Sequence, residues 1–203
     1  MNGGLKFSED IVVRSNLIIT LRERGKIVER REGHNIFLDY GREWLAQLIA
    51  YESFGTPDLP QSDERIKYMG FGIGGTRQIA PDFADSPPLN AYGPVGSFNQ
   101  TDTDPTVLRL ERPVQVSSGA WIGQVQAPAV HDTPTSTTFK RLFTLEELSF
   151  SPYVSVPLSE VGLFLSDANS AFYGNNIVAY DTFDTISKTT AFELEVNWTL
   201  RFG

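Results

Sequence analysis

The segment from Ala191 to Phe202 carries the most regular pattern of the chain, because apolar and polar residues alternate in it without a break. Successive side chains of a β-strand point to opposite faces, so all the apolar residues fall on one side and all the polar residues on the other. A shift of one residue would expose Trp198, so the register is strongly specified. The pattern predicts a half-buried strand whose apolar positions are Phe192, Leu194, Val196, Trp198, Leu200 and Phe202.

Shorter runs with strand character recur along the chain and bring the predicted number of strands to about nine. Near the N-terminus, Asn16–Leu21 and Ile27–Arg31 flank Gly25, which can supply the positive φ of a hairpin turn. Predicted turns fall at 117–119, 128–134 and 167–176. The other predicted strands are Ile66 to Ile73, Val107 to Val116, Trp121 to Gln126, Thr137 to Leu145, Glu160 to Leu165 and Ile177 to Phe183. Many short strands separated by turn residues predict a mainly β fold, an antiparallel β-sandwich.

Two segments depart from the strand pattern. Residues 39–51 begin with Asp39, a residue that can cap a helix, and continue with a single apolar stripe, so we expect one short α-helix there. Residues 76–105 are rich in proline and glycine, which do not sustain a strand ladder. A loop of this length is uncommon in a compact domain and is usually functional. We therefore expect residues 76–105 to form an extended arm that contacts other proteins.

Length and composition favour one domain over residues 1–203, with residues 1–38 forming an N-terminal segment and the charged hairpin. The net charge of −8, from 17 Lys and Arg against 25 Asp and Glu, opposes binding to phosphates or anionic lipid. We therefore expect no membrane contact and no direct, sequence-specific binding of nucleic acid. The chain has no cysteine, which excludes disulfides and thiolate metal sites and is compatible with a reducing cytoplasm.

The residues that carry chemistry do not form a recognisable catalytic or metal-binding motif. The only two histidines, His34 and His131, are far apart in sequence and lack the additional ligands of a zinc site or the elbow of a nucleophilic serine. The carboxylate pairs Glu146–Glu147 and Glu193–Glu195 are typical of a solvated surface, and Gly70–Gly75 is not followed by the helix that a phosphate loop needs. We predict no catalytic residue, no metal and no cofactor; a hydrolase would require one histidine in a pocket.

Two groups of side chains are candidate protein–protein contacts. Basic residues interleaved with glutamates on the predicted hairpin are typical of a solvated face or a polar protein contact. Aromatic residues in the predicted arm could add apolar contacts. The predicted contact residues are Arg22, Arg24, Arg30 and Arg31 on the hairpin, and Phe83, Tyr92 and Phe98 on the arm.

Several motifs together resemble a known family. They are Tyr40–Ala50 followed by Ile66–Gly74, Leu108–Arg112, Ser159–Phe164 with the sequence S-E-V-G-L-F, and Ala179–Lys188 followed by Val196–Leu200. In this order they resemble small β-sandwich structural proteins of tailed bacteriophages, including the virion-attachment domains of tail fibres. The resemblance implies a neck, collar, tail or baseplate subunit of the virion, synthesised in the host cytoplasm. It also implies assembly with copies of itself, as a ring or trimer, and with other phage virion proteins, and a possible role in anchoring fibres.

The attachment domains of tail fibres normally precede a shaft and a receptor-binding tip, whereas the last strand here closes at Gly203, so we expect a separate virion component. An alternative function is a carbohydrate-binding module that recognises the host surface. Such a module would use exposed aromatic side chains such as Tyr92, Trp121 or Tyr173 as stacking platforms, and binding of glycan by the monomer would favour it.

Overall fold

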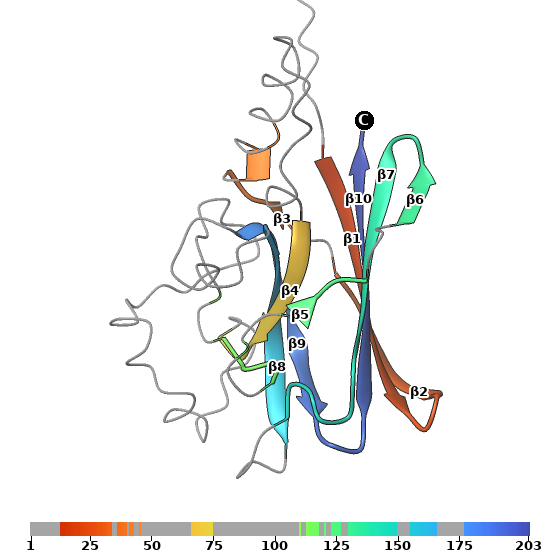
Figure 1. The fold of residues 1–203 in the computed structure, drawn as a ribbon, viewed down its shortest axis with the longest axis vertical. Coiled ribbons are helices and arrows are strands. Elements are labelled where there is room, and N and C mark those ends of the chain that lie inside the picture. Colours follow the sequence, from red (N-terminus) through yellow and green to blue (C-terminus); the bar gives the residue numbers. More distant parts are fainter. Residues whose placement is uncertain are drawn as a thin grey trace, which may run out of the picture.

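A computed structural model describes residues 13–33, 36–39, 41–42, 45, 66–74, 110, 113–117, 120, 123–126, 130–149, 155–165 and 177–203. This part of the chain forms two five-stranded antiparallel sheets that pack face to face, which confirms the predicted mainly β sandwich (Figure 1). The first sheet has the order β2-β1-β10-β7-β6 and the second β3-β9-β8-β4-β5. The strands are β1 Val13–Glu23, β2 Lys26–Gly33, β3 Ile36–Phe37, β4 Ile66–Gly72, β5 Gly123–Gln124, β6 Val130–Thr133, β7 Ser136–Phe143, β8 Val156–Leu165, β9 Ile177–Lys188 and β10 Glu193–Phe202.

Strand β10 lies at the centre of the first sheet and has the alternation that its sequence predicts. Its apolar residues from Leu194 to Leu200 are buried, and the residues between them are partly exposed. Trp198 is fully buried, and its indole N–H donates a hydrogen bond to the Ser15 hydroxyl oxygen at 2.8 Å. The pairing of Trp198 with Leu17 on β1 and with Phe139 on β7 places three large apolar side chains on the inner face. This face forms one half of the core.

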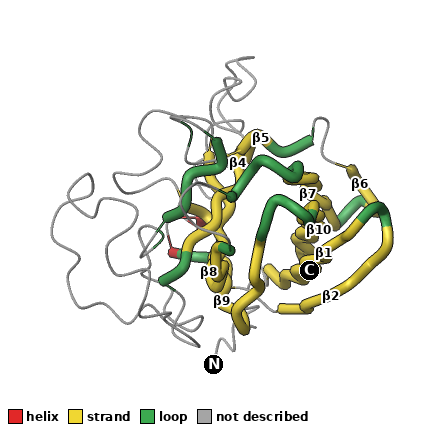
Figure 2. The backbone as a smooth tube through the Cα atoms, turned by 90° about the horizontal axis from the view of Figure 1, so that it is seen from below, coloured by secondary structure: helices red, strands yellow, loops and turns green. Residues whose placement is uncertain are grey.

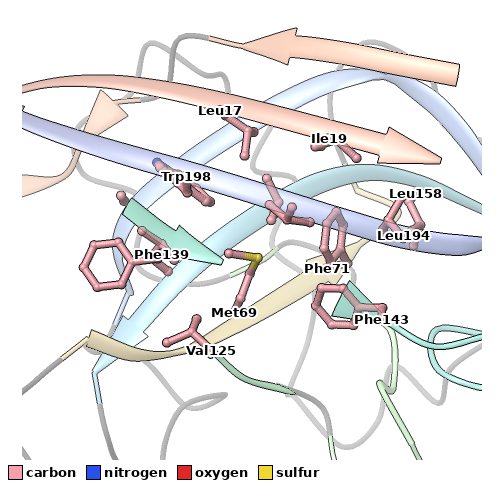
Figure 3. Close-up of a cluster of buried hydrophobic side chains, with 14 of the residues drawn as sticks. Leu17, Ile19, Met69, Phe71, Val125, Phe139, Phe143, Leu158, Leu194 and Trp198 are labelled. Atoms are coloured by element: carbon pink, nitrogen blue, oxygen red, sulfur yellow. The ribbon is translucent and has the colours of Figure 1, made fainter. Parts of the chain in front are cut away.

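The other half of the core comes from the inner face of the second sheet (Figure 3). Phe71 of β4 lies between the sheets and packs edge-on against Phe143 of β7, with ring centroids 5.3 Å apart and planes at 86°. It makes a second edge-on contact with Phe183 of β9 at 6.1 Å. Such edge-to-face pairs stabilise a core beyond the burial of their area.

Strand β8 from Leu158 onward and strand β9 up to Phe183 are buried on both faces, which explains the S-E-V-G-L-F motif. Glu160 is fully buried, and its carboxylate accepts hydrogen bonds from the Gly74 backbone N–H and the Tyr180 hydroxyl, both at 3.0 Å. Gly162 leaves room for a neighbour, because a Cβ at this position would lie 2.6 Å from Cδ1 of Ile177. The glutamate and glycine of this motif therefore have structural roles.

The segment that follows β5 connects the two sheets along one side of the sandwich. The Val125 N–H donates to the Lys67 carbonyl in the second sheet, and the Gln126 N–H donates to the Lys140 carbonyl in the first, both at 2.7 Å. Arg141 of β7 reinforces this side, as its guanidinium donates to the Gln124 carbonyl. Val125 and Gln126 thus join the two sheets through their backbone N–H groups.

Four sequence predictions need correction or lie partly or wholly outside the described residues. Of the predicted strand 107–116, the described residues are buried except for the half-buried Gln115, and they form no strand. Pro113, which lacks an N–H, forms an isolated bridge to Gly72. Residues 130–133, predicted as part of a turn, form β6.

Residues 39, 41, 42 and 45 of the predicted helix are helical. The Arg42 N–H donates to the Leu38 carbonyl at 3.0 Å, so Asp39 lies in the first turn and does not precede it. The predicted arm, 76–105, lies outside the described residues.

Candidate protein interface

The β1–β2 hairpin forms one margin of the first sheet, at the lower right of Figure 1. Glu23 pairs with Lys26, so the turn contains only Arg24 and Gly25, with φ values of 49° and 79°. Positive φ at both positions is typical of a type I′ turn, whose twist matches that of the flanking strands. The predicted role of Gly25 is confirmed. The turn presents Arg24 at the tip of the hairpin.

Arg22 is held against the centre of the first sheet. Its Nε donates to Oε2 of Glu195 on β10 at 2.7 Å, and its Nη1 donates to the Gly25 carbonyl at 3.4 Å. The other Glu195 oxygen accepts a hydrogen bond from the Asn197 amide at 3.1 Å. The Asn197 amide and then Arg22 lower the pKa of Glu195 below its ordinary value, with desolvation acting in the opposite direction. Arg22 is therefore committed to its own sheet.

The other three predicted hairpin arginines differ in how freely they are presented. Arg30 pairs with Glu32 at 2.6 Å, and Arg31 pairs with Glu29. These pairs lie within β2 and are partly exposed, so each contributes little to stability. Arg24 is exposed and forms no ion pair with any other described residue, which makes it the most available to a partner of the four predicted contact arginines.

The hairpin exposes an apolar pair that the sequence analysis did not identify as a contact. Leu21 pairs with Glu29 and Arg22 with Ile27, so Val28 is the extra residue of a β-bulge. A bulge sets two residues against one and changes the direction of a side chain. Without it, Ile27 would fall on the inner face; with it, Ile27 lies opposite Arg22 and is 55% exposed, and Val28 is 48% exposed.

A second exposed apolar pair lies across the first sheet. Leu142 of β7 is 47% exposed and pairs with Glu195 on the outer face, the face turned away from the second sheet. Leu145, just beyond β7, is 43% exposed and precedes the exposed Glu146. These two leucines, Ile27 and Val28 are the large apolar residues that are exposed in the described part of the chain.

A buried lysine lies near the second apolar pair and was also missed by the sequence analysis. Lys188 is fully buried, and its Nζ donates to the carbonyl oxygens of Leu145 at 3.2 Å and Thr189 at 3.0 Å. Burial lowers its pKa to about 8, and the charges of Glu147 and Glu193 partly oppose this shift. Because no part of Lys188 is accessible, its role here is to hold the backbone of this corner together.

The carboxylates predicted to be simply solvated are partly engaged in the fold. Glu147 pairs with Arg141, and its other oxygen accepts a hydrogen bond from the Thr144 N–H at 2.8 Å. Glu195 binds Arg22 as described above. These carboxylates position backbone and side chains at the ends of β7 and β10.

The remaining candidate residues are placed only in part. Phe83, Tyr92 and Phe98 lie outside the described residues, as do His34 and the possible stacking residues Trp121 and Tyr173. His131 lies in β6, and its side chain is not described. Among the described side chains, no group of three or more His, Asp or Glu could hold a metal ion. No helix in this part of the chain has the length and apolar character needed to span a membrane.

Comparisons of the chain with known family models, with curated proteins and with solved structures gave no match. The basis for a functional proposal is therefore the surface of the sandwich together with the motifs of the sequence.

Proposed function

We propose that this protein is a structural subunit of a tailed-phage virion, at the neck, collar, tail or baseplate, that assembles with copies of itself and with neighbouring virion proteins. The exposed pair Ile27 and Val28 on an outermost strand is the observation that carries this proposal. Adjacent apolar residues on a projecting hairpin are typical of a protein contact, particularly beside cations that steer a partner. The β-sandwich agrees with the family that the motifs resemble.

The use of ionisable side chains also supports a structural subunit. In the described part, the buried Glu160 holds Gly74 and Tyr180, and the buried Lys188 holds two backbone carbonyls. A catalytic acid or base needs access to a substrate proton. These buried groups are instead fully occupied in joining strands and turns.

The carbohydrate-binding alternative receives less support from the outer face of the first sheet. Glycan recognition by stacking needs exposed aromatic rings. Along β2, β1, β10 and β7 the described outward residues are charged, hydroxyl-bearing, amide or aliphatic, without Phe, Tyr or Trp. This face suits contacts with polar protein surfaces better than stacking on sugars.

The proposal is tested on particles of the tailed phage whose genome encodes this chain. We expect mass spectrometry of density-purified particles to detect the chain in a fixed copy number, and gold-labelled antibodies to mark the neck, tail or baseplate. Antibody pre-absorbed with the purified protein serves as the control. Absence of the chain from purified particles, with abundant protein in the infected-cell lysate, would refute a virion role. So would a gene that lies outside any phage genome.

A further inference from the structure

The charge of this chain is divided unequally between the hairpin and the remainder. Residues 13–33 contain six of the 17 Lys and Arg but only three of the 25 Asp and Glu, which gives this segment a net charge of +3. The rest of the chain has 11 cations against 22 anions and a net charge of −11. A basic hairpin on an acidic chain is complementary to the remainder of a second copy.

The two exposed apolar pairs lie toward opposite edges of the first sheet, Ile27 and Val28 on β2 and Leu142 and Leu145 on β7 and just beyond it. Figure 2 shows β1 and β10 between β2 and β7. β6 pairs with β7 only from Ser136 to Thr138, so β7 is the outermost described strand at the level of Leu142. Both pairs also lie toward the same end of the sheet, the end at which β10 begins. Ile27 pairs with Arg22, which pairs in turn with Glu193, the first residue of β10. The next residue of β10, Leu194, pairs with Phe143, which follows Leu142.

The charges beside the two apolar pairs are of opposite sign. Arg24 and Lys26 are exposed at the turn next to Ile27 and Val28, with one exposed anion, Glu23, opposite Lys26. Glu146 is exposed next to Leu145. Glu195 lies opposite Leu142 but is ion-paired with Arg22, and Lys140 is a further cation on this part of the face. The free charge at the hairpin is thus mainly basic, and the exposed charge next to Leu145 is acidic. We call Leu142 and Leu145 the leucine surface, and Ile27 and Val28 the hairpin surface.

We propose that these two surfaces are the halves of one head-to-tail contact, in which Ile27 and Val28 of one copy pack on Leu142 and Leu145 of the next. This inference deepens the proposed function, on which it rests, by naming a second copy as the partner of the hairpin. A two-fold contact between hairpins would bring Arg24 and Lys26 of both copies together, and like charges across an interface oppose association. A heterologous contact instead repeats from copy to copy and gives a ring if it closes.

The decisive experiment mixes two variants of the full chain in sedimentation velocity over a concentration series. Ile27→Asp/Val28→Asp removes the hairpin surface, and Leu142→Asp/Leu145→Asp removes the leucine surface. We expect wild-type oligomers larger than a dimer, and dissociation constants raised more than tenfold for each variant alone. An equimolar mixture should form a 1:1 pair and stop there, because one intact surface of each kind remains. A monomeric wild type, a wild type limited to dimers, or a mixture that stays monomeric would overturn the contact.

Charge reversal provides a second test that does not depend on apolar substitutions. Lys26→Glu and Glu146→Lys should each weaken association, and the chain carrying both should recover it. Asp184→Lys, at an exposed carboxylate of β9 on the other sheet, is the matched control and should leave association unchanged. Circular dichroism of every variant verifies the fold. Failure of the double reversal to recover association would count against the pairing of these surfaces.

The contact and the virion role fail in distinguishable ways. If the chain forms head-to-tail oligomers but is absent from phage particles, the virion role is refuted and the contact is not. If the chain is present in particles, but neither the hairpin nor the leucine substitutions change its self-association, the head-to-tail contact is refuted and the virion role is not.

Discussion

Lys188 is a buried cation whose hydrogen-bond partners in the described part of the chain are two backbone carbonyl oxygens. Its Nζ donates to two carbonyls, and no described carboxylate lies within ion-pair distance. Water would solvate the ammonium group better than this corner does, which is why burial lowers its pKa to about 8. Glu147 and Glu193 are near enough to offset part of the shift. Because burial disfavours the charged form of Lys188, we expect its ionisation to change the free energy of unfolding with pH.

We expect the free energy of unfolding to rise between pH 8 and 10.5 because of Lys188. In this window the unfolded chain keeps the lysine proton up to its ordinary pKa of 10.5, whereas the folded chain has released it above about 8. Stability rises with pH wherever the unfolded state binds more protons, here by at most about 3 kcal/mol. Urea unfolding of the wild type and Lys188→Met at several pH values measures this difference. Parallel pH curves for the two proteins would contradict the prediction.

At the scale of elements, the β1–β2 hairpin combines a favourable turn type with an unfavourable residue. A type I′ turn prefers Asn-Gly, but here Arg24 adopts the left-handed conformation before Gly25. That conformation costs an L-residue such as arginine about 1 kcal/mol. The turn is therefore less stable than it could be at Arg24, a cation that has no ion pair among the described residues. Such a combination is typical of binding sites.

Arg24→Asn should separate the stability of the hairpin from its binding. We expect the free energy of unfolding to rise by about 0.5 kcal/mol, because asparagine adopts the left-handed conformation more easily. Self-association should weaken at the same time, because the tip loses a cation. Denaturant unfolding and sedimentation velocity on the same samples check both effects. A less stable variant, or one that associates as strongly as the wild type, would contradict this account of the turn.

The elements also show which features the sequence can predict. Alternation along 191–202 predicted β10, and Gly25 predicted the hairpin turn, because both depend on local pattern. The exposure of Ile27 depends on a bulge whose position is set by pairing with β1, so two neighbouring β-branched residues did not reveal it. β6 was hidden by its short length and flanking prolines.

Contacts between distant residues were even less accessible to prediction. Arg22 and Glu195 are 173 residues apart and meet only because β1 and β10 are neighbours in the first sheet. The leucine surface likewise depends on where β7 ends relative to its neighbours. The sequence therefore predicted the fold class and the basic hairpin, but not the apolar pairs from which we derive the head-to-tail contact.

At the scale of the whole molecule, polar contacts supplement the apolar core in joining the two sheets. Arg141 of the first sheet donates to the Gln124 carbonyl at the edge of the second, pairs with Glu147, and lies 4.6 Å from the Phe143 ring centroid. Gly123 allows this approach, since a Cβ there would overlap the guanidinium. One side chain thus connects β5, β7 and the turn that leads to β8.

Arg141→Met should weaken this side of the sandwich, although methionine retains much of the apolar contact. We expect the free energy of unfolding to fall by about 2 kcal/mol, because Glu147 is left without its partner while remaining largely buried. The neighbouring Lys140→Met changes the outer face only and should stay within about 0.5 kcal/mol of the wild type. Hydrogen exchange should show faster opening of β5 and β7 in Arg141→Met, with β1 and β9 unaffected. Equal losses in the two variants, or uniform loss of protection across both sheets, would show that Arg141 does not join the sheets in this way.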